Sequence, residues 1–288
     1  MFSPIVNKLF ATKPKGTLYH YTSLKGAMGI IESGSIRATE IRFFSDAAEI
    51  KHMFNLLRDG MTRFRPRLEY ELTNWLSKRL THKHRLFVAS FTANGNLLSQ
   101  WRSYSPAAKG INLGFNAATL HASATRQSYE IGKCIYDPKI QNSVVTAILK
   151  RIGALAKLRE KTIDPLSEYT GTSYYDVFDE VAVDLLRIAA LLKHPSFHEE
   201  EEWRVVSPII TNLEEVPIEY REGASMLVPF MNFRLPEASN ACLDLERVTL
   251  GPTPNVDISM MSLADYFSSK GVTPRKGLAY CHIPYRPW

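Results

Sequence analysis

Three short segments of the chain carry residue types that could act together on a sugar. They are LYHYT at 18–22, LLSQWRSY at 97–104 and EEEEWRVV at 199–206. Cleavage of the bond between a ribose and a nicotinamide leaves positive charge on the sugar carbon, as in glycoside hydrolysis. A carboxylate stabilises that charge, an aromatic ring stacks on the leaving base, and a histidine hydrogen-bonds ribose hydroxyls. The residue types therefore predict a site that holds a dinucleotide while its glycosidic bond breaks.

The acidic segment supplies the candidate catalytic pair, Glu202 and Glu200. A strand that begins at Glu202 would carry Glu202 and Arg204 on one face and Trp203 on the other. Glu200 then lies on the same side as Glu202. One carboxylate could bind ribose hydroxyls while the other positions an acceptor or is repelled into a raised pKa. The alternative is a charged, exposed turn before a strand, because adjacent acids are usually solvated.

The other two segments supply candidate contacts to the ligand. His20 lies between two tyrosines, so one strand face would carry the histidine and the other face both phenol rings. Trp101 and Tyr104 are three residues apart on an expected helix, where core packing is an alternative explanation. A core position is also the alternative for the histidine. The candidate cofactor-binding residues are His20, Tyr21, Thr22, Ser99, Trp101 and Tyr104.

The composition narrows the class of protein. A chain of 288 residues that is 45% hydrophobic can bury a substantial core. Its longest apolar stretches, such as IAALL at 188–192, fall well short of the roughly 18 residues of a membrane span. The first residues lack the apolar core of a secretory signal. Three cysteines that lie far apart in the sequence fit buried thiols in a reducing compartment better than a zinc site. We therefore expect a cytoplasmic protein with no membrane partner and no metal.

Two basic segments offer a different chemistry. They are RFRPR at 63–67 and SKRLTHKHR at 77–85, in a chain whose formal charge of +6 is mild for its length. Such clusters attract phosphates by charge alone, whether on a nucleic acid or on a dinucleotide. The alternative is a solvated helix end. The chain has no glycine-rich phosphate loop between a strand and a helix and no nucleophile elbow.

The hydrophobic pattern predicts a single α+β domain over residues 1–288. Helical spacing in two stretches, interrupted near Asp164-Pro165, predicts a helical insert at about 139–193. Expected strands lie at 16–22, 35–44, 84–93, 109–116, 202–210, 226–235, 246–252 and 278–286. Expected helices lie at 23–33, 46–60, 67–80 and 259–269, with a short one that carries Tyr104.

Several of these segments resemble a bacterial family of uncharacterised proteins catalogued as domain of unknown function 2971. The resemblance extends over nearly the whole chain. It departs from the family at Ser45-Asp46-Ala47, where Asn-Asp-Pro is usual. The matching segments are YHYTSLKGAMGIIESGSIRAT at 19–39, FFSDAAEI at 43–50, FVASFTANGNLLSQWRSYSPAAKGINLGFN at 87–116, FHEEEEWRVV at 197–206, LVPF at 227–230, LGP at 250–252 and IPYR at 283–286.

The order of the three chemical segments also resembles the His-Tyr-Glu layout of the ADP-ribosyltransferase superfamily. That resemblance implies a split, strongly bent antiparallel or mixed sheet with NAD, as substrate, in the cleft between its halves. It assigns His20, followed by the hydroxyl of Thr22, to the adenosine ribose and Tyr104 to the nicotinamide ring. Glu202 would orient the nicotinamide ribose and stabilise the developing charge. By analogy it also suggests a toxin or antiphage effector.

Three functional hypotheses follow from the sequence. The first is an enzyme that transfers ADP-ribose from NAD to a protein or nucleic-acid acceptor, or that only hydrolyses NAD. The second is a non-catalytic module with a degenerate cleft that binds nucleic acid through the basic segments. The third combines them, with nucleic acid as the acceptor. A cognate inhibitor protein is compatible with the first and the third.

Overall fold

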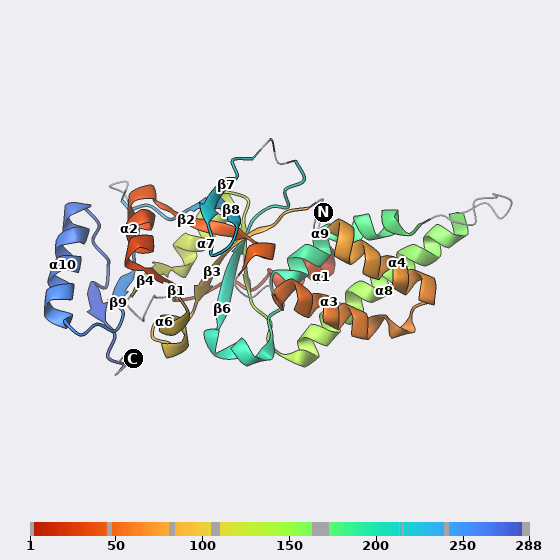
Figure 1. Cartoon of the computed structure of the whole chain (residues 1–288), viewed down its shortest axis with the longest axis horizontal. Helices are drawn as coiled ribbons and strands as arrows, with labels where there is room; N and C mark the ends of the chain where they lie inside the picture. The colour runs from red at the N-terminus through yellow and green to blue at the C-terminus, as the bar shows by residue number, and fades with distance from the viewer. Residues whose placement is uncertain are drawn as a thin grey trace.

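The protein has a sheet-rich half and a helical half (Figure 1). The structure is a computed structural model, and it describes residues 3–44, 48–80, 84–104, 110–162, 173–212, 214, 216–238 and 242–283. In Figure 1 the sheet and its helices occupy the left and centre, and long helices extend to the right. Ser45-Asp46-Ala47, the break near Asp164-Pro165 and the last residues of IPYR lie outside the described residues.

Ten strands of the described residues form one mixed sheet that does not close into a barrel. Its main path runs β10-β9-β4-β1-β3-β2-β8-β7, and β6 joins β3 to β5. The β9–β10 pair is parallel, and the other pairs are antiparallel. The strands are β1 (Thr17–Ser23), β2 (Ser35–Glu40), β3 (Phe87–Thr92), β4 (Gly110–Asn116), β5 (Glu130–Lys133), β6 (Glu202–Val206), β7 (Glu219–Glu222), β8 (Leu227–Arg234), β9 (Arg247–Leu250) and β10 (Leu278–Tyr280).

Strand β3 is the point at which the sheet divides. One of its edges pairs with β6 along residues 88–92. The other edge pairs with β2 only at Phe87 and Val88, and with β1 only at Thr92. Between these points β1 and β2 would compete for the same edge, so the two strands separate into different branches. The sheet is therefore split beside the middle of β3.

The sheet half has its own apolar core. Side chains from the strands pack with three helices, α2 (Leu24–Ser33), α7 (Ala117–Arg126) and α10 (Val256–Ser269). The start and the end of α2 follow the sequence signals. Ser23 accepts a hydrogen bond from the Gly26 amide at the N-terminus, and Gly34 ends the helix at a positive φ of 64°, which glycine adopts without strain.

The helical half is larger than the predicted insert. Helices α8 (Pro138–Thr162) and α9 (Tyr175–Ala189) fall within or next to the predicted range, but α1 (Pro4–Leu9), α3 (Ala48–Gly60) and α4 (Pro66–Trp75) share the same apolar core. The π-helical segment η3 (Leu76–Leu80) continues α4. Val88 and Val206 of the sheet also belong to this core, so the helical half packs directly on the strands at the split.

Several predicted boundaries were wrong. Of the expected strand at 35–44, only the part up to Glu40 is extended, and the 3₁₀ turn η1 (Ile41–Phe43) follows it. Strand β6 ends at Val206, and Pro208, two residues further on, cannot donate a ladder hydrogen bond. Four elements were not predicted, namely α1, α7, β5 and β7. Helix α1 is only six residues long, and β5 and β7 are four residues each. No described helix is both long and apolar enough to span a membrane.

Candidate functional site

A small open cavity of about 50 Å³ lies at the split of the sheet. Strand β3 contributes its floor, β1 and helix α6 (Leu98–Tyr104) border one side, and the start of β6 borders the other. Five of the predicted site residues line it, namely His20, Tyr21, Tyr104, Glu200 and Glu202. The remaining lining residues are Tyr19, Ser90, Phe91, Thr92 and Gln100. The structure thus brings together residues from all three chemical segments.

Glu202 is held in place by two buried cations. The Arg204 guanidinium donates from Nε to Oε1 and from Nη2 to Oε2, each at 3.0 Å, and Lys193 Nζ donates to Oε2 at 2.8 Å. Burial would raise the pKa of Glu202, but these cations lower it to about 2. Glu202 is therefore an anion at neutral pH. The predicted alternative of a pKa raised by repulsion is wrong for this residue.

Glu200 stands beside Glu202 because of the backbone between them. The 3₁₀ segment η5 (Pro195–Glu200) ends at Glu201, which has a positive φ of 42°. This left-handed conformation is uncommon for a residue with a side chain and is a marker of constrained sites. The Glu200 carboxylate accepts a hydrogen bond from Lys193, and its carbonyl oxygen accepts one from the Thr92 hydroxyl at 2.5 Å. Both carboxylates are buried, so the alternative of a solvated acidic turn does not apply to them.

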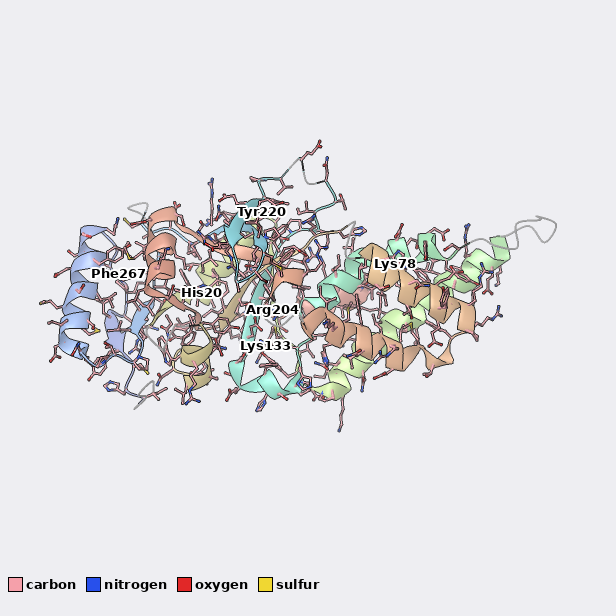
Figure 2. The ribbon with its side chains drawn as sticks, in the orientation of Figure 1. His20, Lys78, Lys133, Arg204, Tyr220 and Phe267 are labelled. Atoms are coloured by element: carbon pink, nitrogen blue, oxygen red, sulfur yellow. The ribbon has the colours of Figure 1, made fainter. Side chains whose placement is uncertain are left out.

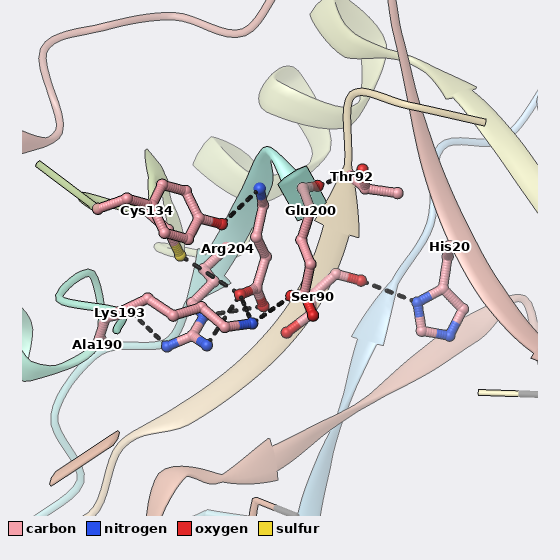
Figure 3. Close-up of polar contacts among 10 residues, drawn as sticks. His20, Ser90, Thr92, Cys134, Ala190, Lys193, Glu200 and Arg204 are labelled. Atoms are coloured by element: carbon pink, nitrogen blue, oxygen red, sulfur yellow. Dashed lines mark hydrogen bonds and ion pairs between the residues drawn. The ribbon is translucent and has the colours of Figure 1, made fainter. Parts of the chain in front are cut away.

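The two carboxylates and two cations form a balanced cluster, which we call the carboxylate cluster: Glu200, Glu202, Lys193 and Arg204. Its formal charges cancel, which lowers the cost of placing four charged groups out of water. Figure 3 shows these ion pairs beside strand β3. Cys134 Sγ also lies 3.5 Å from Glu202 Oε2, and the Glu202 amide donates to the Tyr136 hydroxyl at 3.0 Å.

His20 lies at the opposite edge of β3 from Glu200 (Figure 3). Its Nδ1 is 2.9 Å from the carbonyl oxygen of Ser90. Because a carbonyl can only accept, this contact assigns the ring proton to Nδ1. Burial lowers the pKa of His20, against the opposing effect of the Ser90 bond. The ring is therefore neutral at physiological pH, and Nε2 carries a lone pair that accepts a hydrogen bond.

Tyr21 orders the loop that precedes α6. Its hydroxyl donates to the Asn94 carbonyl at 3.1 Å and accepts from the Leu97 amide at 3.0 Å. Burial, the largest cause, raises the pKa of Tyr21 to about 12, so the phenol keeps its proton. In the same loop a side chain at Gly95 would come within 2.7 Å of the Tyr19 ring. These contacts position α6, and with it Tyr104, relative to β1.

The α6 residues differ in their placement. Tyr104 lines the cavity with 43% of its surface exposed, as a ring that receives a ligand requires. Trp101 is fully buried and meets Tyr21 edge to face at a centroid distance of 4.6 Å. The Ser99 hydroxyl is buried without a hydrogen-bond partner among the described residues. Neither Ser99 nor Trp101 lines the cavity, and their contact with a ligand stays a prediction.

Thr22 lies away from the cavity lining, next to helix α2. A side chain at Gly26 would come within 2.2 Å of its hydroxyl oxygen, so that hydroxyl faces the first turn of the helix. A ligand contact by Thr22 likewise stays a prediction.

Lys193 was not predicted as a member of the site. Arg204 was predicted on the same strand face as Glu202, without a role, and the Arg204–Glu202 ion pair confirms that shared face. Lys193 ends the apolar run IAALLK, and a charge that ends such a run usually marks solvent exposure. Only the folded backbone reveals that it is buried. Gln100 and Thr92 also line the cavity. Nothing in their residue type or spacing distinguished them from neighbouring residues in the sequence.

The basic segments lie outside this site. Figure 2 shows Lys78 over the helical half, well apart from His20. In the first segment, Arg65 pairs with Glu160 at 3.3 Å and Arg67 pairs with Glu71 at 2.9 Å. These acids offset part of the charge that would attract phosphates. Residues 81–83 and the side chain of Arg79 lie outside the described part of the chain.

Comparison with known proteins adds one observation. Residues 100–205 match the family model described as Protein of unknown function (DUF2971). The match begins within α6 and ends within β6. It therefore includes Tyr104 and all four residues of the carboxylate cluster. It supports the resemblance to that family stated from the sequence. Neither the curated proteins nor the solved structures gave a match.

Proposed function

We propose that the chain is an enzyme of the ADP-ribosyltransferase type that binds NAD in the cavity and cleaves the bond between nicotinamide and ribose. The observation that carries the proposal is the convergence of His20, Tyr104, Glu200 and Glu202 on one cavity at the split of the sheet. We also propose that the split sheet is of the ADP-ribosyltransferase-like type. The order of the elements supports it, because a histidine on β1, a tyrosine on a helix before β4 and a glutamate that opens β6 follow the His-Tyr-Glu layout.

In the proposed reaction the carboxylates stabilise positive charge. The bond between C1′ of the ribose and the ring nitrogen breaks, and its electron pair leaves with nicotinamide. The sugar becomes oxocarbenium-like and is attacked by water or by an acceptor group, which loses its proton. Glu202 is anionic throughout, so its role is electrostatic and it does not act as a proton donor.

The remaining residues have distinct binding roles in this proposal. Neutral His20, with its proton on Nδ1 toward Ser90, presents Nε2 as an acceptor for a hydroxyl of the adenosine ribose. Tyr104, half-exposed at the cavity, stacks on the nicotinamide ring. Glu200 is the second carboxylate, and it binds a hydroxyl of the nicotinamide ribose or positions the acceptor. A role as a toxin or antiphage effector, with a protein or nucleic acid as acceptor, is part of the same proposal.

The decisive experiment measures nicotinamide released from NAD by the purified chain, with and without cell extract as a source of acceptor. We expect release by the wild type and a loss of about 100-fold or more in Glu202→Gln, because one preorganised charge contributes about that much to a polar transition state. Glu199→Gln is the matched control, since Glu199 is an exposed member of the same acidic run. Intact NAD in both conditions would contradict the proposal.

A further inference from the structure

Lys193 reaches both carboxylates of the site from outside the sheet. It follows α9, and its side chain is 3% exposed. Nζ donates to Glu202 Oε2 at 2.8 Å and also to Glu200 Oε2. Two carboxylates that share a site repel each other, and one of them normally becomes protonated. A cation between them removes this conflict, so both stay charged and adjacent.

The backbone of Lys193 is fixed by the helical half. Its amide donates to the Ile135 carbonyl at 3.2 Å, and its carbonyl accepts from Gln141 Nε2 at 2.7 Å. The same Gln141 amide donates to the Ile135 carbonyl at 2.6 Å, and the Gln141 carbonyl oxygen lies 3.1 Å from His52 Nε2 on α3. A continuous chain of contacts therefore links α3 and α8 to the lysine that holds the two carboxylates.

We propose that Lys193 is a positioning residue, which the helical half supplies to the cavity and which holds Glu200 and Glu202 in their active arrangement. This inference rests on the proposed function of the site. It makes the helical half a necessary part of the active centre, and it gives the lysine a role separate from the bulk stability of the sheet.

The removal of Lys193 has a defined electrostatic consequence. The titratable and charged groups that face Glu202 are Arg204 on β6, Lys193, Glu200 at the end of η5, and Cys134 and Tyr136 after β5. In Lys193→Met the net charge of the carboxylate cluster becomes −1, so the pKa of Glu202 rises from about 2 toward its ordinary value. In a plot of kcat against pH, the fall in activity on the acid side should therefore move to higher pH; we call this fall the acid limb.

The test compares Lys193→Met with Lys150→Met, an exposed lysine of α8, in the full-length chain. We expect kcat for nicotinamide release to fall on the order of 100-fold in Lys193→Met, because the reacting groups are misplaced by about an ångström. We also expect an acid limb at higher pH, and a several-fold recovery of kcat in Lys193→Ala on addition of methylammonium. Lys150→Met should match the wild type in all three measurements.

The outcomes separate this inference from the proposed function. If the wild type is active, and Lys193→Met has the same kcat and the same acid limb, only the role of Lys193 is overturned. A wild type that releases no nicotinamide overturns both. If Lys193→Met does not fold, Lys193→Met/Glu200→Gln restores the charge balance, and ¹³C NMR of the carboxyl groups then reads the Glu202 titration directly. A Glu202 titration in that variant equal to the one in Glu200→Gln alone would also overturn the role.

Discussion

The two sides of the cavity are built by different physical means. On one side the carboxylate cluster is buried and fixed by ion pairs within 3.0 Å. On the other side, His20 is fixed by one hydrogen bond to a backbone carbonyl, and Tyr104 stands partly in solvent. On the first side the same charged groups contribute to the proposed catalysis and to the stability of the fold. On the second side a substitution leaves no ion without its partner, so it costs the fold less.

This difference gives the two sides separate experimental signatures. A change in the carboxylate cluster leaves a charge buried without its partner, which is expensive. A change at His20 or Tyr104 removes a ligand contact but leaves no buried charge without its partner. Substitutions on the first side should therefore alter both the free energy of unfolding and the turnover, and those on the second side mainly substrate binding.

The largest effect is expected for Arg204→Met. Its side chain is 1% exposed and donates to both Glu202 oxygens. Its removal therefore leaves a buried anion without this partner. We expect the free energy of unfolding in urea to fall by about 3–5 kcal/mol. Arg126→Met, at an exposed position at the end of α7, should stay within about 0.5 kcal/mol of the wild type. Equal losses in the two variants would show that the cluster is not a source of stability.

Acid titration should distinguish the two sides within one protein. Glu202 has a folded pKa of about 2 against an ordinary value of 4.5, so its contribution is complete above about pH 4.5 and is lost as the pH falls toward 2. His20 has a folded pKa below the ordinary 6.5, so its contribution is lost as the pH falls from 6.5 toward that lower pKa. Urea unfolding at a series of pH values measures both losses.

The His20 part of that profile is isolated by subtracting the profile of His20→Gln. We expect the difference between the two proteins to change only below pH 6.5 and to flatten below the folded pKa of the histidine. A difference that is constant with pH would mean that the ring is not buried as a neutral group.

A smaller effect is expected on substrate binding in His20→Gln. The loss of one hydrogen-bond acceptor to a ribose hydroxyl should raise KM for NAD by about tenfold, with kcat changed less. Steady-state nicotinamide release provides both constants. A fall in kcat with an unchanged KM would place the histidine at the reacting ribose instead of the adenosine ribose.

The smallest effect is expected for Tyr104. Because the ring is 43% exposed, Tyr104→Ala should leave the free energy of unfolding within about 0.5 kcal/mol of the wild type. The loss of stacking should raise KM for NAD by about two- to tenfold, and Tyr104→Phe should retain most of the affinity. Equal KM values for Tyr104→Ala and the wild type would remove the ring from the binding site.

The sequence predicts the local backbone structure around this site better than the ion pairs within the site. The cap at Ser23, the stop at Gly34 and the shared face of Glu202 and Arg204 are confirmed, because each depends on neighbours within a few residues. Lys193 could not be predicted, since its role arises from a contact chain through Ile135 and Gln141 that is distant in sequence. The missed strands β5 and β7 are too short to show a period.

The division of the sheet could not be predicted from local sequence patterns either. It arises because β1 and β2 both pair with the same edge of β3, and register between distant strands is not encoded in the period of any one of them. The gathering of the three chemical segments at one site was predicted from their residue types and from the resemblance to the His-Tyr-Glu layout, and not from any local pattern.

The most direct test of the central claim is a crystal structure with an NAD analogue whose bond between nicotinamide and ribose resists cleavage. We predict that the nicotinamide ribose lies against Glu200 and Glu202, the nicotinamide on Tyr104 and the adenosine ribose at His20 Nε2. An analogue bound away from the split of the sheet, or an empty cavity at saturating analogue, would contradict it.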